Sequence, residues 1–199
     1  TTRTYSRREH IDDLHDTYVD LCQLLSLKAW KEGNDAKALE YQLASNEYPE
    51  NQGYAHLEYY ARDAQVYYNI GLAYERVGET DTAMQWYEKA ADVRVKDADV
   101  QYLYEKGLAL CKIGRKSEAR PLFRHIVKTG KAQVTDYFNT FFESFDRGPF
   151  EQDINSKAYY TQGIGYMALG RNFKARRCFR KALHQRNDNV WAKYWLENR

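Results

Sequence analysis

The sequence predicts an all-α protein built as a stack of antiparallel helix pairs. Helix-breaking residues are scarce, with 11 Gly and 3 Pro among 199 residues, too few for a loop-rich or all-β chain. The same pattern of small and aromatic residues also recurs three times, as expected of a helical repeat. Because 43% of the residues are hydrophobic, the chain can bury a core, which disfavours disorder.

The recurring pattern is a Gly, a second Gly seven residues later, an Ala five further on and an aromatic residue four after that. The three sets are Gly71, Gly78, Ala83 and Tyr87; Gly107, Gly114, Ala119 and Phe123; and Gly163, Gly170, Ala175 and Phe179. We expect the first glycine to allow close approach of the second helix, and the second glycine to end the first helix. The alanine extends the close approach, and the aromatic residue is expected to fill space against the next pair.

This pattern resembles the tetratricopeptide repeat, a helix-turn-helix unit of 34 residues. The resemblance implies a right-handed solenoid forming a single domain over 1-199. Its regular members would be a second repeat at 61-96, a third at 98-129 and a fourth at 156-187.

A degenerate first repeat is expected at 6-50, where Gly33 and Ala38 keep the five-residue spacing. Its first helix would run from roughly Ser6 to Glu32, and Pro49 would close its second helix. Terminal repeats are commonly atypical in this way.

Two intervals exceed the repeat length. Residues Gly33 and Gly78 are 45 positions apart, which lengthens the link between the first two repeats. The interval from Gly114 to Gly170 is 56 positions and leaves room for an insertion at 131-155. We expect a helix there from about Ala132 to Phe145, followed by a loop from Asp146 to Asp153.

The last segment, 188-199, is expected to be a capping helix that covers the end of the stack. Asp188 is the predicted N-cap residue. Trp191, Tyr194 and Trp195 would supply the apolar side chains that cover the last repeat.

A narrower resemblance involves YPENQGYAHLEYYARDAQVYYNIGLAYERVG at 48–78 and FEQDINSKAYYTQGIGYMALG at 150–170. These stretches are similar to the C-terminal helical region of large uncharacterised bacterial proteins, in which a β-rich, carbohydrate-enzyme-like portion comes first. The resemblance implies a bacterial origin and a chain that is part of a longer protein. It also implies an alternative function, a helical accessory region that packs on a β-rich catalytic portion.

The predicted binding residues occupy equivalent places on the first helices, which line the concave face in repeats of this type. They are Tyr68, Tyr104 and Tyr160, then Leu72, Leu108 and Ile164, together with Asn69. Tyrosine offers rigid apolar area and a hydroxyl, which suit a peptide or a sugar ring, and such side chains often anchor interfaces. The expected partner is a peptide or another part of the same polypeptide. The alternative is that the tyrosines only pack between neighbouring first helices. A clamp for a C-terminal carboxylate is disfavoured because Glu105 and Thr161 stand where Asn69 stands in the second repeat.

The remaining features point away from other functions. A net charge of +2 gives no global argument for nucleic acid or an anionic membrane as partner. The basic run from Arg171 to Arg186 is expected to be a solvated helix face. Cys22, Cys111 and Cys178 are expected to be buried, reduced thiols.

No catalytic, nucleotide-binding or metal-binding motif occurs. The histidines lie apart, and Glu143 with Asp146, or Glu151 with Asp153, are expected to be solvated loop acids. We therefore expect a non-enzymatic, cytoplasmic protein-interaction scaffold without a cofactor or a metal. The sequence leaves its oligomeric state open.

Overall fold

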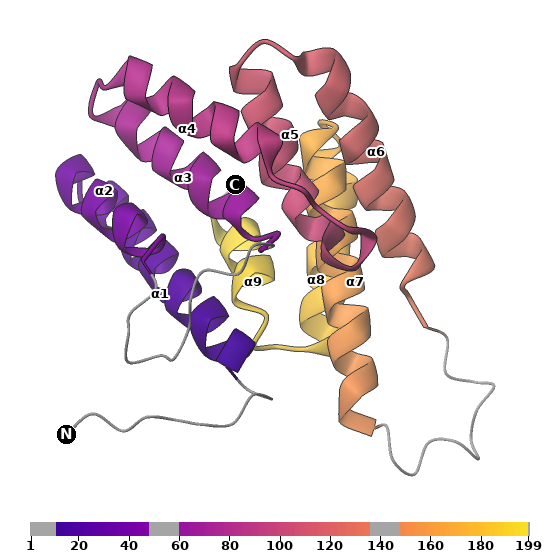
Figure 1. Cartoon of the computed structure of the whole chain (residues 1–199). Coiled ribbons are helices and arrows are strands. Elements are labelled where there is room, and N and C mark those ends of the chain that lie inside the picture. Colours follow the sequence, from indigo (N-terminus) through magenta and orange to yellow (C-terminus); the bar gives the residue numbers. More distant parts are fainter. Residues whose placement is uncertain (1–10, 48–59, 136–147, 199) are drawn as a thin grey trace, which may run out of the picture. The chain divides into compact units, whose positions relative to one another are not determined.

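The computed structural model describes residues 11–47, 60–135 and 148–198. These parts of the chain form helices and contain no strand, which confirms the predicted all-α class (Figure 1). The helices are α1 (Ile11–Lys31), α2 (Asp35–Ala44), α3 (Asp63–Arg76), α4 (Thr80–Asp92), the 3₁₀ helix η2 (Asp97–Tyr102), α5 (Leu103–Lys112), α6 (Lys116–Ala132), α7 (Gly148–Ala168), α8 (Asn172–Gln185) and α9 (Val190–Glu197). The pairs α1–α2, α3–α4, α5–α6 and α7–α8 overlap the four predicted repeats, although α7 begins at Gly148 and the predicted fourth repeat begins at 156.

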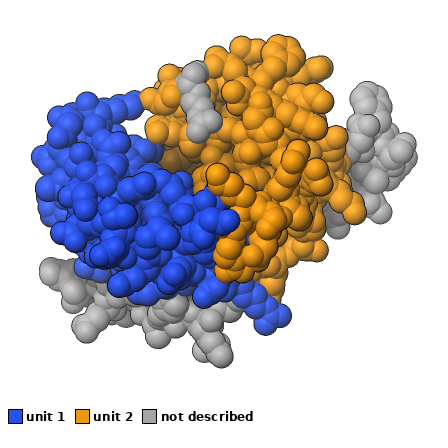
Figure 2. Space-filling view, turned by 90° about the horizontal axis from the view of Figure 1, so that it is seen from above, with its two compact units in different colours: residues 1–94, 109–114 blue, residues 95–108, 115–199 orange. Residues whose placement is uncertain are grey.

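The chain divides into two compact units, shown in different colours in Figure 2. Unit 1 comprises residues 1–94 and 109–114, and unit 2 comprises residues 95–108 and 115–199. Helix α5 contributes residues to both units. The single domain over 1-199 and the exact repeat boundaries stay predictions.

In unit 1, consecutive helices pack on one another from α1 to α4. Its core contains Val19 from α1 and Val66 and Ile70 from α3, all buried, with Trp86 of α4 packed against them. Arg62, just before α3, is buried and forms ion pairs with two aspartates of α1. The degenerate first repeat is therefore tied to the second by both apolar and charged contacts.

In unit 2, α6 packs on α7, α7 on α8, and α8 on α9. Two glycines that the sequence pattern did not single out allow α6 and α7 to approach closely. A Cβ atom on Gly165 would lie 2.8 Å from Val127 Cγ2, and one on Gly130 would lie 3.0 Å from the Ala158 carbonyl oxygen. Gln162 of α7 also donates a hydrogen bond to the Gly130 carbonyl, at 3.0 Å.

The glycine pattern is confirmed at the turns between paired helices. Gly33, Gly78, Gly114 and Gly170 have φ angles of 74°, 89°, 83° and 71°. These values lie in the left-handed region, which glycine adopts without the steric cost of a Cβ atom. Each glycine ends a first helix, and after Gly33 the Asn34 side chain accepts a hydrogen bond from the Lys37 amide and so begins α2.

The first glycine of each set is confirmed as a site of close approach. A Cβ atom on Gly71, Gly107 or Gly163 would lie within 2.3–2.7 Å of a ring carbon. The three rings are those of Tyr87, Phe123 and Phe179. Each aromatic ring thus covers the glycine of its own helix pair, and its predicted contact with the next pair stays a prediction.

The predicted insertion differs from the structure where it is described. The loop expected from Asp146 to Asp153 is wrong from residue 148 onward, because α7 already begins at Gly148. Pro149 suits the first turn of a helix, where its missing N–H would have no intrahelical acceptor. The helix expected from about Ala132 does not begin there, because α6 ends at Ala132 and residues 133–135 are not helical. The rest of that expected helix lies outside the described residues.

Other predictions also fall on undescribed residues. The start of the first helix before Ile11, the closing Pro49, and the carboxylates Glu143 and Asp146 are among them. Within the described range, α1 ends at Lys31, one residue before the predicted Glu32.

The three cysteines are free thiols. Cys22 and Cys178 are buried as expected, and burial raises the pKa of each thiol. Cys111 differs from the expectation because it is only partly buried. Within the described residues, no helix has the length and apolar character needed to cross a membrane.

Candidate partner-binding surface

Each predicted tyrosine rests on the aromatic residue of its own helix pair. The ring centroids are 5.6 Å apart for Tyr68 and Tyr87 in unit 1. In unit 2 the distances are 6.5 Å for Tyr104 with Phe123 and 6.1 Å for Tyr160 with Phe179. The same aromatic ring also covers the close-approach glycine, so each tyrosine rests on a ring that is packed against the first helix of its pair. For these tyrosines the sequence predicts partner binding or packing between neighbouring first helices, and it does not predict packing within one helix pair.

The predicted binding residues differ in exposure. Tyr68, Tyr160, Leu72, Leu108 and Asn69 are partly buried and retain some surface. Ile164 is only 2% exposed, so in this conformation it belongs to the core of unit 2. Binding by the whole set stays a prediction.

Tyr104 is 5% exposed, and the C-terminal helix contributes to its burial. Trp195 of α9 meets the Tyr104 ring edge-on, with centroids 6.4 Å apart and planes at 80°. This is a favourable geometry for an aromatic pair. Tyr194 packs against Trp195 at 5.2 Å and against Trp191 at 6.0 Å, so α9 presents a group of aromatic side chains.

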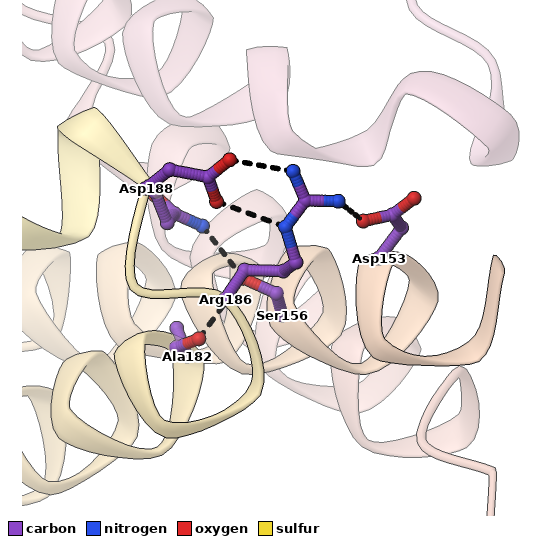
Figure 3. A network of polar contacts seen from close by, with 6 residues as sticks. Asp153, Ser156, Ala182, Arg186 and Asp188 are labelled. Atoms are coloured by element: carbon purple, nitrogen blue, oxygen red, sulfur yellow. Dashed lines mark hydrogen bonds and ion pairs between the residues drawn. The ribbon is translucent and has the colours of Figure 1, made fainter. Parts of the chain in front are cut away.

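The link between α8 and α9 is held by a polar network (Figure 3). The Arg186 guanidinium donates to both carboxylate oxygens of Asp188, at 2.9 and 2.6 Å, and also pairs with Asp153 of α7. Ser156 of α7 donates to the Ala182 carbonyl at 3.0 Å. These contacts fix the point at which the chain leaves α8.

The N-cap of α9 is Asn189, so the prediction of Asp188 as the cap is wrong. The Asn189 side-chain oxygen accepts a hydrogen bond from the Ala192 amide at 2.9 Å, and its amide group donates to Ser156 Oγ at 2.9 Å. Asp188 instead faces Arg186, which lowers the pKa of its carboxyl group. Asp and Asn are both strong capping residues, so composition alone did not separate these neighbours.

The described residues give no group of three or more His, Cys, Asp or Glu side chains that could hold a metal ion. One histidine has a carboxylate partner, since His125 Nε2 lies 2.9 Å from Asp97 Oδ1. Both side chains are exposed to solvent, at 40% and 85%. This pair lacks the burial that usually accompanies a catalytic acid or base.

Comparison with known proteins supports the repeat assignment for two helix pairs. Residues 64–94 and 156–189 match models of the tetratricopeptide repeat, and these ranges correspond to α3–α4 and α7–α8. No curated protein matches the chain.

Several solved structures are similar at low identity. MamA from Desulfovibrio magneticus RS-1, from residue 41 to its end, is 18% identical, with 90% of this chain and 81% of that chain covered and a TM-score of 0.33. A MamA RS-1 double mutant gives the same values. YrrB, described as a TPR protein with an unusual peptide-binding site, is 18% identical, with 89% of each chain covered and a TM-score of 0.30.

Proposed function

We propose that this chain is a protein-interaction scaffold that binds a peptide or a partner domain on its first helices. The proposed contact residues are Tyr68, Tyr104 and Tyr160, at equivalent places in three helix pairs. Tetratricopeptide repeats commonly serve as surfaces for peptides or proteins, and two segments of the chain match them. A concave binding face and a non-enzymatic role without a cofactor are parts of the same proposal.

The contact between Trp195 and Tyr104 carries the proposal. Within unit 2, the aromatic side chain of Trp195 on helix α9 packs against Tyr104, one of the proposed contact residues. A partner helix or peptide with an aromatic side chain would make the same edge-on contact. Trp and Tyr are the residue types that most often anchor protein interfaces.

The three tyrosines are already held in place before a partner binds, which supports the same proposal. The three tyrosines rest on rings that are themselves fixed over glycines, so they lose little side-chain freedom when a partner arrives. A surface that is already ordered keeps more of its contact energy as affinity.

The test uses a synthetic peptide with the sequence of residues 189–198, NVWAKYWLEN, added to the full chain carrying Trp195→Ala. That substitution removes the intramolecular ring from Tyr104, and the peptide offers it in trans. We expect binding, measured by fluorescence anisotropy, that weakens by about tenfold or more when Tyr104→Ala is added.

A matched peptide with alanine in place of the residue equivalent to Trp195 serves as the control and should bind poorly. Melting curves of both protein variants show whether they remain folded. Equal affinity of the two peptides, or no effect of Tyr104→Ala in a folded protein, would contradict the proposal.

A further inference from the structure

The second helices of unit 2 have an unusual balance of charge. Helices α6 and α8 together contain ten Lys and Arg residues and one acidic residue, Glu118. The ten are Lys116, Arg120, Arg124, Lys128, Lys131, Lys174, Arg176, Arg177, Arg180 and Lys181, and all are exposed. The basic run noted in the sequence, from Arg171 to Arg186, includes the five cations of α8 but not the five of α6.

Four of these cations come together from the two helices. The ammonium groups of Lys131 from α6 and Lys174 from α8 lie over the same Tyr166 ring, 5.9 and 5.7 Å from its centroid. Lys181 lies 5.0 Å from the centre of the Tyr159 ring, about two turns from Tyr166 on the same face of α7. The charges of Lys181, Lys131 and Arg177 all act on the Cys178 thiol, opposing the rise that burial causes in its pKa. We call Lys131, Lys174, Arg177 and Lys181 the basic cluster.

Three acidic side chains of unit 2 pair with arginines outside the basic cluster. Glu118 pairs with Arg115 at 2.7 Å, and both Asp153 and Asp188 pair with Arg186. In the ranges that the structure describes, no ion pair involves a member of the basic cluster. Like charges held close together without a counter-ion favour an anionic ligand.

The small net charge of the chain conceals this asymmetry. Unit 1 contains 11 Lys and Arg against 17 Asp and Glu, for a net charge of −6, whereas unit 2 contains 19 against 11, for +8. Unit 2 by itself therefore carries a positive charge that can attract an anionic partner, although the net charge of the whole chain is only +2.

We propose that the basic cluster is a second interaction site, which binds an Asp- and Glu-rich segment of a protein partner. The site lies on α6 and α8 and is separate from the first-helix tyrosines of the proposed function. Carboxylates of an extended acidic segment would pair with ammonium and guanidinium groups drawn from both helices.

The surroundings favour a protein segment over other polyanions. Proteins that bind single-stranded nucleic acid without base pairing offer aromatic faces for base stacking. Here lysine ammonium groups already cover the rings of Tyr166 and Tyr159. A membrane-surface helix needs a broad apolar face, but on α8 only Phe173 is a large exposed apolar side chain, at 80%.

The experiment uses the full chain and a fluorescent oligoglutamate peptide as the probe. The test variant carries Lys131→Gln, Lys174→Gln and Lys181→Gln. The matched control carries Lys28→Gln, Lys89→Gln and Lys193→Gln, three exposed lysines outside α6 and α8. Both variants lose the same charge, so only the position of the substitutions differs.

We expect the test variant to bind the peptide about tenfold more weakly than the parent, as the loss of three exposed charge pairs implies. The control variant should stay close to the parent. Affinity should also fall as salt is added. Equal weakening of the two variants would overturn the proposal, because binding would then follow net charge alone.

Oligo-dT and vesicles containing phosphatidylserine distinguish the classes of partner. If oligo-dT and the vesicles both bind more weakly than the oligoglutamate peptide, the result supports an acidic protein segment as the partner. Tighter binding of either one, lost in the test variant, would overturn that assignment and make the cluster a nucleic-acid or membrane site. Binding of the tryptophan-bearing peptide to the first-helix tyrosines should be unaffected by the test variant, so failure of one proposal is distinguishable from failure of the other.

Discussion

Tyr87 donates a hydrogen bond to Glu75, with 2.6 Å between the phenolic oxygen and Oε2 of the carboxylate. The Oε2 atom of Glu75 also accepts a hydrogen bond from Lys112 Nζ at 2.5 Å. The hydrogen bond from Lys112, and to a smaller extent the one from Tyr87, holds the pKa of Glu75 below its usual value. Burial and the neighbouring carboxylate raise the pKa of Tyr87. The ring that covers Gly71 is thus also held at its hydroxyl end.

This arrangement predicts an acid-sensitive contribution to stability. Because the folded-state pKa of Glu75 is lowered from 4.5, its contribution is present above that value and is lost as pH falls through the lower folded value. Glu75→Gln should therefore reduce the free energy of unfolding at neutral pH, by less than about 1 kcal/mol for a side chain this exposed. Urea denaturation at several pH values checks this. A difference between parent and variant that persists in strong acid would contradict it.

Substitution by alanine should destabilise the protein at Gly163 in α7 and at Gly170 in the following turn, for different reasons. At Gly163 the new Cβ atom would lie 2.3 Å from Phe179 Cε1, so Gly163→Ala should cost about 1–3 kcal/mol through overpacking. At Gly170 nothing lies within 4 Å, but φ is +71°, so Gly170→Ala should cost about 1–2 kcal/mol through backbone strain.

Phe179→Leu separates the two mechanisms, because it frees space beside Gly163 only. In urea denaturation of the double variants, the added cost of Gly163→Ala should shrink and that of Gly170→Ala should not. Equal behaviour of the two glycines in the Phe179→Leu background would show that the ring is not the obstacle.

The start of α9 should depend on Asn189 more than on Asp188. Asn189→Ala removes the cap on the Ala192 amide and should cost about 0.5–2 kcal/mol. Asp188 forms an exposed ion pair with Arg186, so Asp188→Ala should cost less. Thermal unfolding of the two variants compares them directly, and the opposite order would restore Asp188 as the effective cap.

The aromatic contact between α9 and α5 should appear as coupling in a double-mutant cycle. Tyr104→Ala and Trp195→Ala should interact by about 0.5–1.5 kcal/mol in the free energy of unfolding. Tyr159→Ala provides the control, since the ring contact of Tyr159 is with Lys181. Its effect should add to that of Trp195→Ala within about 0.3–0.5 kcal/mol. Additivity of the Tyr104 pair would mean that its ring contact contributes nothing measurable.

Local features of the fold could be predicted from the sequence because they depend on short spacing. A glycine that must adopt positive φ and a glycine that faces a ring are both fixed within one helix pair, as at Gly170 and Gly163. The predicted loop before residue 153 failed for a local reason too. Gly, Pro and acidic residues indicate a loop by composition, yet the first turn of a helix tolerates all of them.

Contacts between distant positions could not be predicted in this way. Trp195 meets Tyr104 from 91 positions away, and Lys131 and Lys174 share one tyrosine although 43 positions separate them. These contacts depend on the path of the α8–α9 link and on how far α6 and α8 lie along α7. Repeat spacing does not encode either quantity.

The uneven burial of the cysteines gives the native protein one addressable thiol. Cys22 and Cys178 are 5% and 8% exposed with raised pKa values, whereas Cys111 retains more surface. Thiolate is the form that reacts with maleimides, so Cys111 should be alkylated first and the other two only after unfolding. A dye can therefore be attached near the end of α5 without mutagenesis, and the number of labels per chain reports the folded fraction.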